Sequence, residues 1–212
     1  MRFDDAVARL QRLPDPLPAP PAALDPRLEA SAGTVPRDGI PGHREAAVLV
    51  LLYPGPDGEA WTVLTARPSG DLRHAGEVSF PGGAVEPGDE SMAATALREA
   101  REEVGIEPAQ CGLRVLGELG TVDVRVSGFR LHPVLAVAER RPSLARDAWE
   151  VSAILEVPVR HFAAGAPIEE VEEDRGGWHL RYGAYPVAGY RIWGATARVL
   201  GQLGAVLGRE TD

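Results

Sequence analysis

The stretch FPGGAVEPGDESMAATALREAREEVGI, residues 80–106, decides the fold. It opens with two glycines and closes with a helix-forming run that carries Glu99, Glu102 and Glu103. Carboxylates three and four residues apart on a helix repel each other by about 0.2–0.5 kcal/mol per pair. The repulsion is tolerable where the carboxylates share a ligand.

The run after the glycines predicts an amphipathic helix with recognisable ends. Asp89 or Ser91 can accept hydrogen bonds as the N-cap. Gly105 suits the left-handed position after the last turn, and Ile106 is the apolar residue that often follows it. The side of the helix expected to be buried consists mostly of small residues, which lets the helix pack closely: Ala93, Ala96, Leu97, Ala100 and Val104.

The three glutamates fall in one arc of about 100° beside this buried side, at about 100° of rotation per residue. Arg98 and Arg101 lie on the other flank. Oxygen donors that converge at the edge of a core are the ligands that Mg²⁺ and Mn²⁺ prefer. The alternative to a metal site is a charged, solvent-exposed helix face. The loop before the helix helps to choose between these two interpretations.

That loop favours the metal-binding interpretation. Gly82 and Gly83 let the backbone approach a ligand closely and let a carbonyl point at a metal. Asp89 or Glu90 could pair with Arg98 and brace the loop against the helix. Loop and helix together predict a site at their junction.

These residues resemble the Nudix box. That motif runs glycine, five residues, glutamate, seven residues, then R-E-U-x-E-E-x-G-U, where U is a bulky apolar residue. The chain departs from it in three ways: the segment from Gly83 to Arg98 is one residue longer, the first acid is either Asp89 or Glu90, and the first U is Ala100. The matching positions are Gly83, Arg98, Glu99, Glu102, Glu103, Gly105 and Ile106.

The longer loop is similar to that of a subfamily, the coenzyme A pyrophosphatases. The upstream signature of that subfamily resembles VLTARPSGDLRHAGEVSFPGG, residues 63–83. The chain departs from it at Val63, Pro68 and Leu72, where the subfamily has leucine, serine and arginine. The segment 190–200 also looks like the subfamily's C-terminal part, so the resemblance covers roughly residues 40–203. The signature matches at Leu64, Thr65, Arg67, Gly76, Phe80, Pro81, Gly82 and Gly83.

The resemblance implies an α/β fold, a Nudix-type α/β/α sandwich around a mixed β-sheet. It implies Mg²⁺- or Mn²⁺-dependent hydrolysis of the pyrophosphate bond of coenzyme A or an acyl derivative, giving 3′,5′-ADP and 4′-phosphopantetheine. Two alternatives stay open. One is a Nudix hydrolase of ADP-ribose or another nucleoside diphosphate derivative. The other is a Nudix-like regulator that binds such a ligand without turnover, although a pure binder has no need for the full set of metal ligands.

The resemblance also assigns roles to individual residues. Glu99 and Glu103 would be the principal metal ligands, Glu102 an additional or water-mediated one, and the Gly82 carbonyl a possible contributor. Arg98 would complete the catalytic set in a structural role. The general base is left open between Asp123, Glu150 and the acids of 169–174. The candidates for binding the substrate are Arg67, Arg73, His74 and Gly83.

Composition restricts the number of domains, the partners and the cellular compartment. With 212 residues and 44% hydrophobic residues, the chain can bury a full core as one domain with extensions. Its net charge of −9 argues against nucleic acid and anionic membrane as partners. Cys111 is the single cysteine, so no internal disulfide forms. The acidic N-terminus and the short apolar run 46–53 predict a cytoplasmic protein, and the resemblance adds a possible homodimer.

The rest of the chain predicts a proline-rich N-terminal arm, residues 1–40, and one Nudix domain, residues 41–208. The arm is expected to contain a short helix at 2–13 and an extended stretch at 13–26, which is either a floppy leader or packed on the body or on a second subunit. A turn between 45–53 and 60–67 predicts a hairpin, and 169–177 is expected to be an acidic surface turn. Further strands are expected at 77–80, 113–124, 129–139 and 176–194, a strand or turn followed by a short helical stretch at 148–162, and a helix at 195–208.

Overall fold

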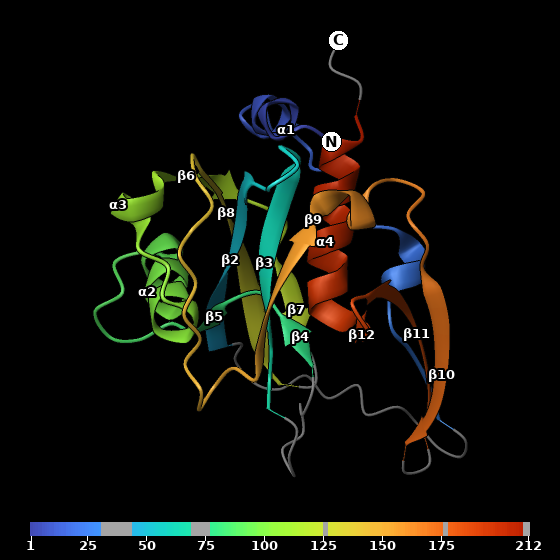
Figure 1. Ribbon diagram of the computed structural model, residues 1–212. Coiled ribbons are helices and arrows are strands. Elements are labelled where there is room, and N and C mark those ends of the chain that lie inside the picture. Colours follow the sequence, from blue (N-terminus) through green and yellow to red (C-terminus); the bar gives the residue numbers. More distant parts are fainter. Residues whose placement is uncertain (31–43, 69–76, 125–126, 176–177, 210–212) are drawn as a thin grey trace.

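The computed structural model describes residues 1–30, 44–68, 77–124, 127–175 and 178–209 (Figure 1). The apolar runs of the sequence form a large mixed sheet at its centre. Strands β2 and β8 run parallel, and the other pairs in this sheet are antiparallel. The order is β4-β3-β2-β8-β6, with β5 on β2, β7 on β8 and β9 on β3. The strands are β2 (Arg44–Pro54), β3 (Ala60–Ala66), β4 (Val78–Ser79), β5 (Gly82–Ala84), β6 (Leu113–Glu118), β7 (Val122–Val124), β8 (Phe129–Ala138) and β9 (Ala153–Pro158).

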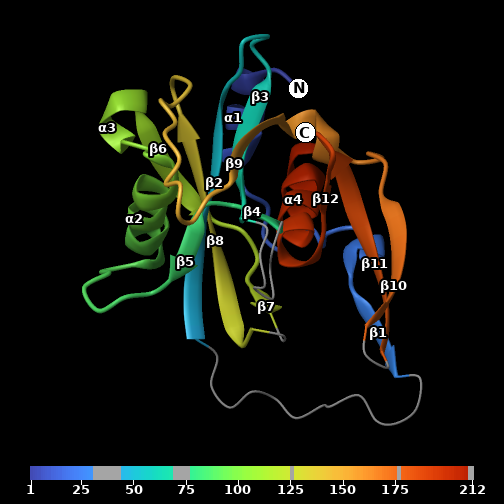
Figure 2. The same cartoon turned by 60° about the horizontal axis from the view of Figure 1, so that its bottom comes forward.

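The central strand β2 is buried along nearly its whole length, as expected for a strand covered on both faces. Helix α2 (Met92–Val104) packs on one face. Helices α1 (Phe3–Leu10) and α4 (Gly194–Leu207) pack on the other. Figure 2 shows α2 and α4 on opposite sides of the sheet. The predicted α/β/α sandwich around a mixed sheet is therefore confirmed.

The N-terminal arm packs on the body over its described part. Helix α1 confirms the helix expected at 2–13. A 3₁₀ turn, Ala22–Leu24, buries Leu24 completely, and Gln202 of α4 donates a hydrogen bond to the Pro18 carbonyl at 3.0 Å. The arm then adds strand β1 (Arg27–Ala30) to strand β11 (Trp178–Val187). The boundary between arm and domain stays a prediction.

A second, smaller sheet contains β1, β11 (Trp178–Val187), β10 (Glu169–Arg175) and β12 (Tyr190–Ile192). Helix α4 lies between it and the large sheet (Figures 1 and 2). The expected acidic turn at 169–177 is wrong, because residues 169–175 pair with β11 in regular register. Val171 and Glu173 are half-buried between exposed acids. This alternation of burial is not visible in the sequence, because five residues of the strand are acids. Charged residues are typical of an edge strand.

The other predicted elements agree with the structure. The hairpin of β2 and β3 is paired from Leu52 and Thr62 to Pro54 and Ala60. Strands β4, β6, β7, β8, β11 and β12 occupy the expected runs, and 148–162 contains β9 followed by a 3₁₀ turn, Val159–Phe162. Cys111, at the end of α3 (Pro108–Cys111), is buried as a small apolar side chain. Among the described residues, no helix combines the length and the apolar character needed to cross a bilayer.

Candidate metal and catalytic site

Helix α2 begins and ends as its sequence predicts. Of the two candidate N-caps the structure selects Ser91, whose Oγ accepts a hydrogen bond from the Ala94 amide at 3.1 Å. Gly105 ends the helix in the left-handed conformation, with φ of 70°. The Ile106 amide donates to the Ala100 carbonyl at 3.2 Å. These caps fix the helix relative to the glycine loop that precedes it.

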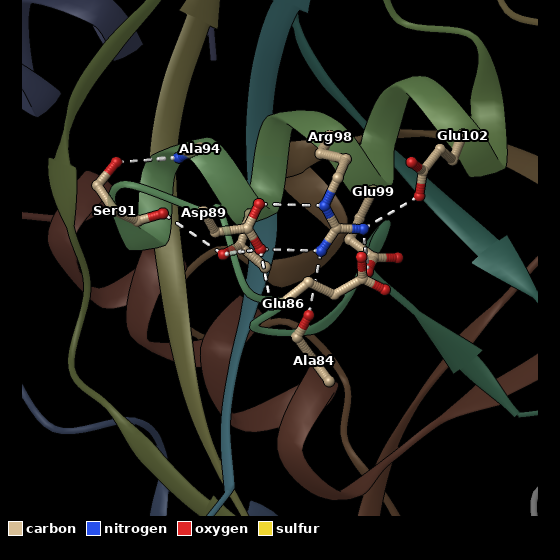
Figure 3. Close-up of polar contacts among 9 residues, drawn as sticks. Ala84, Glu86, Asp89, Ser91, Ala94, Arg98, Glu99 and Glu102 are labelled. Atoms are coloured by element: carbon tan, nitrogen blue, oxygen red, sulfur yellow. Dashed lines mark hydrogen bonds and ion pairs between the residues drawn. The ribbon is translucent and has the colours of Figure 1, made fainter.

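Asp89, free from capping, binds Arg98 instead (Figure 3). Arg98 Nε donates to Asp89 Oδ1 at 3.1 Å, and Nη2 donates to Asp89 Oδ2 at 3.0 Å and to the Ala84 carbonyl at 3.1 Å. The Glu86 amide and the Thr95 hydroxyl also donate to Oδ2, both at 2.9 Å. Arg98 holds the pKa of the Asp89 carboxyl well below its usual range. Of the two candidate acids, Asp89 is the one that braces the loop.

Arg98 also offsets part of the electrostatic repulsion among the glutamates. Its Nη1 donates to Glu99 Oε1 at 2.8 Å and to Glu102 Oε2 at 3.1 Å. Burial raises the pKa of Glu99, and Arg98 opposes that rise. With Glu99 and Glu102 turned towards this guanidinium, no three acidic, histidine or cysteine side chains among the described residues are grouped closely enough to hold a metal ion.

Glu103 differs from its two neighbours because Arg98 does not reach it. The residue is 7% exposed, and Oε2 accepts a hydrogen bond from the Gly82 amide at 3.2 Å. Burial raises its pKa to about 7; the Gly82 amide and Arg67 lower it, and the charges of Glu99 and Glu150 raise it further. A buried carboxylate is costly without a paired cation. Oxygen donors in this setting fit Mg²⁺ or Mn²⁺, which would supply that charge.

The glycine loop lies directly over these carboxylates. Gly82 and Gly83 in β5 pair with Val48 and Ala47 of β2. A Cβ on Gly83 would lie 2.5 Å from Glu99 Oε1, so only glycine leaves the carboxylate its place. A Cβ on Gly82 would lie 2.3 Å from the Ala47 carbonyl oxygen, which is a packing constraint. The structure thus brings Gly82, Gly83 and the predicted metal ligands together.

Residues 145–152 contact the C-terminal end of α2 and the end of β3. The Asp147 amide donates to the Glu103 carbonyl at 2.8 Å, next to the bond from the Ala145 amide to the Val104 carbonyl at 3.0 Å. Ser152 Oγ donates to the carbonyl of Arg67 at 3.1 Å. The segment therefore links the C-terminal end of α2 to the end of β3. Sequence reasoning missed Asp147 and Ser152, because both act through contacts with residues distant in the chain.

Of the predicted substrate ligands, Arg67 is described and lies close enough to lower the pKa of Glu103. Its side chain is exposed, and its amide donates to the Glu77 carbonyl at 3.0 Å. Arg73 and His74 lie outside the described residues, as does Leu72. The three groups of candidate bases lie in different parts of the fold. Asp123, on β7, pairs with Arg130 at 2.9 Å, and the acids of 169–174 belong to the smaller sheet, whereas the charge of Glu150 acts on both Glu99 and Glu103.

A mixed sheet between helices, with a glycine loop that feeds an acidic helix, is the architecture of a Nudix-type hydrolase. The family model described as NUDIX domain matches residues 43–172. The chain is 36% identical over 168 residues to "Uncharacterized Nudix hydrolase NudL" of Cronobacter sakazakii, covering 79% of this chain and 85% of that protein. It is 37% identical over 164 residues to the NudL of Photorhabdus laumondii subsp. laumondii, covering 76% and 83%. The chain therefore belongs to the Nudix hydrolase family.

Part of the chain is also similar to solved structures. "Crystal structure of a Nudix Hydrolase from M. Smegmatis, RenU" is 23% identical and covers 57% of this chain and 73% of that one, with a TM-score of 0.47. "Crystal Structure of a C. elegans Ap4A Hydrolase Binary Complex" is 20% identical and covers 54% and 80%, with a TM-score of 0.45.

Proposed function

We propose that this Nudix hydrolase cleaves the pyrophosphate bond of coenzyme A or an acyl-coenzyme A and requires Mg²⁺ or Mn²⁺. The observation that carries the metal requirement is Glu103, a buried carboxylate next to Glu99 that Arg98 leaves without a cation. The substrate rests on the subfamily signature in residues 63–83, which ends in the glycine loop of the site.

Glu99 and Glu103 would hold the metal, with Glu102 as an additional or water-mediated ligand and the Gly82 carbonyl as a possible contributor. When bound, the metal neutralises the anionic pyrophosphate and lowers the pKa of a bound water. Arg98 contacts Asp89 and Ala84 separately from Glu99 and Glu102, and these contacts brace the loop.

The substrate's phosphates need cationic partners on this acidic chain. We propose that Arg67, whose charge lowers the pKa of Glu103, binds them together with Arg73 and His74 in the segment that follows. The backbone at Gly83 is open to close approach by a ligand because it lacks a Cβ. Coenzyme A carries a 3′-phosphate that ADP-ribose lacks, and a cationic partner such as Arg67 would favour the ligand with this extra negative charge.

Water adds to one phosphorus of the pyrophosphate and the bond from that phosphorus to the bridging oxygen breaks. Coenzyme A then yields 3′,5′-ADP and 4′-phosphopantetheine. The substrate would be a small molecule in the cytoplasm, with no nucleic acid or membrane partner, and a homodimer is part of the proposal. ADP-ribose or another nucleoside diphosphate derivative is the second candidate, favoured by Leu72, which stands where the subfamily has arginine.

A substrate panel tests the choice of substrate. The purified full chain is assayed with coenzyme A, acetyl-coenzyme A, 3′-dephospho-coenzyme A, ADP-ribose, NADH and diadenosine polyphosphates, and the products are identified. We expect the highest kcat/KM for coenzyme A or its acyl derivative. Preference for ADP-ribose would overturn the substrate and leave the hydrolase intact. Binding of these ligands without turnover in Mg²⁺ or Mn²⁺ would support the non-catalytic regulator instead.

Arg67→Ala sharpens this test. Loss of a charged hydrogen bond costs about 1.5–3 kcal/mol, so kcat/KM for coenzyme A should fall roughly ten- to a hundredfold. The loss should be smaller for 3′-dephospho-coenzyme A if Arg67 reads the 3′-phosphate. Equal losses on both substrates would show that Arg67 does not recognise that group.

A further inference from the structure

Two hydroxyl side chains, Thr65 and Ser79, lie opposite each other where β3 and β4 pair. Thr65 Oγ1 lies 3.2 Å from Ser79 Oγ and 3.4 Å from the Ser79 carbonyl oxygen. Thr65 is 2% exposed, whereas Ser79 is half-buried and keeps access to solvent. The pair therefore has one buried member and one member that a ligand can reach.

The alternation of side chains along both strands determines which face of the sheet carries this pair. Val78 and Phe80, on either side of Ser79, belong to the core on the α4 side of the sheet. Leu64, next to Thr65, belongs to the same core. Successive side chains of a strand point to opposite faces. Both hydroxyls therefore lie on the face of the sheet on which α2 packs.

The segment that carries Ser79 leads directly into the glycine loop of the candidate site. Gly82 follows Ser79 by three residues, which span at most about 10 Å of extended chain. The Gly82 amide donates to the Glu103 carboxylate, and Gly83 lies directly against the Glu99 carboxylate. The hydroxyl pair and the candidate metal ligands therefore share one face of the sheet, at a separation that a metal-bound diphosphate can bridge.

A cationic side chain, Arg67, lies next to the hydroxyl pair. Its amide donates to the Glu77 carbonyl at 3.0 Å, which continues the pairing of β3 and β4 by one residue. Because Arg67 follows Thr65 by two residues, its side chain leaves the sheet on the same face. The side chain is exposed, and within the part of the chain that the structure describes no hydrogen bond or ion pair holds its guanidinium. A guanidinium in this state suits an anionic ligand such as phosphate.

The hydrogen-bonding capacity of the hydroxyl pair leaves one donor for such a ligand. Each hydroxyl carries one proton. When Thr65 donates to Ser79 Oγ, the proton of Ser79 has no acceptor among the described residues. A phosphate oxygen accepts hydrogen bonds strongly, so an anion beside Ser79 would favour this arrangement.

We propose that Ser79 donates a hydrogen bond to the diphosphate of the substrate and, together with Arg67, binds the phosphate that lies farther from the metal. This subsite rests on the proposed function, but its ligand is the diphosphate group, which coenzyme A and ADP-ribose share. Thr65 is a positioning residue, because it acts by orienting the Ser79 hydroxyl.

Binding of α,β-methylene-ADP, a diphosphate that cannot be cleaved at its bridge, tests the subsite without turnover. Isothermal titration calorimetry of the full chain in Mn²⁺ gives the Kd. A hydrogen bond to a charged group contributes roughly ten- to a hundredfold in affinity. Ser79→Ala should therefore raise the Kd, and lower kcat/KM equally for coenzyme A and 3′-dephospho-coenzyme A, by this factor. Ser79→Thr keeps a hydroxyl and should restore most of the affinity.

Two buried threonines of β3 provide a matched pair of variants. Thr65→Val removes the group that orients the Ser79 hydroxyl, so the Kd should rise by less than in Ser79→Ala. Thr62 lies on the opposite face of the strand, and its buried hydroxyl has no hydrogen-bond partner among the described residues. Thr62→Val should therefore keep the wild-type Kd and kcat/KM. A merely structural hydroxyl pair would lower the melting temperature of Thr65→Val and Ser79→Ala and leave the Kd unchanged, which would overturn the subsite.

The remaining outcomes separate the subsite from the proposed function. If the wild type hydrolyses none of the diphosphates but binds α,β-methylene-ADP with a Kd that depends on Ser79, the proposed function fails and the subsite stands. If the wild type is active and Ser79→Ala keeps the wild-type Kd and kcat/KM, the subsite alone is overturned. A loss confined to coenzyme A would also overturn it, because Ser79 would then bind the 3′-phosphate. A wild type that does not bind α,β-methylene-ADP contradicts the subsite as well.

Discussion

Helices α2 and α4 cover opposite faces of the same sheet but use their polar residues differently. The polar residues of α4 hold the fold together: Arg198 pairs with Asp25 at 3.0 Å, and Gln202 Oε1 accepts from the Gly120 amide at 2.7 Å. Helix α2 packs through small residues and keeps a buried glutamate, Glu103, at the edge of its core. The candidate site therefore lies on the face of the sheet with the smaller apolar cluster.

Leu203→Ala should produce the largest effect, on stability. Leu203 is fully buried in the core between α4 and the sheet, and truncating a buried leucine costs about 2–5 kcal/mol. Urea unfolding should show this loss, whereas kcat per folded molecule should match the wild type. A loss of kcat in the folded variant would show that the two faces are not separable.

Glu103→Gln, on the other face of the sheet, should lower kcat and leave stability nearly unchanged. The change keeps the shape of the side chain but removes a charge needed for metal binding, and loss of one such electrostatic group costs about 10²–10³ in kcat. Far-ultraviolet circular dichroism and the melting temperature report the fold, and kcat reports the site. Near-normal turnover in this variant would remove Glu103 from the metal site.

The pH dependence of stability follows from the same residue. The Glu103 carboxyl has a pKa of about 7 in the folded state against 4.5 as its ordinary value. Between these values the folded state binds more protons than the unfolded state, so the stability of the metal-free protein falls as the pH rises through this window, by at most about 3 kcal/mol.

Urea midpoints of metal-free wild type and Glu103→Gln at pH 5 and pH 8 measure this term. The wild type should lose more stability than the variant over this range. Identical pH profiles would show that Glu103 titrates normally. Metal binding near pH 7 should also release protons, because the ligand must be deprotonated.

Substitutions of the two adjacent glycines should have different effects, one on stability and the other on activity. Gly82→Ala places a Cβ 2.3 Å from a backbone oxygen of β2, so the melting temperature should fall. Gly83→Ala displaces the flexible Glu99 carboxylate instead, and disturbing a ligand in this way costs about 10–100-fold in activity. If Gly83→Ala lowers stability and activity in proportion, Gly83 is only a packing residue.

Local chemistry explains which features were predictable from the sequence. The caps of α2, its small buried side and the pairing of an acid with Arg98 depend on residues within about two turns of one another, so spacing alone predicts them. The β2–β3 hairpin was predictable from its turn for the same reason. Strand β10 was missed because its acids hide a period of two, and its pairing with β11 is a tertiary contact.

The site was predictable as a set of residues but not as an arrangement. The sequence places three glutamates in one arc, whereas the structure turns Glu99 and Glu102 towards Arg98 and leaves Glu103 alone in the core. That division depends on burial, which spacing does not report. The hydrogen bond between Asp147 and Glu103 joins residues far apart in the chain, so no spacing in the sequence predicts it.

The most direct test is hydrolysis of coenzyme A by the purified chain in ¹⁸O-labelled water, with products followed by mass spectrometry. With Mg²⁺ or Mn²⁺ we expect 3′,5′-ADP and 4′-phosphopantetheine, with one labelled oxygen in only one of the two products. Addition of EDTA should stop the reaction, and Glu103→Gln should slow it about 10²–10³-fold. Unchanged coenzyme A in the presence of either metal, or hydrolysis that continues undiminished in EDTA, would contradict the proposed function.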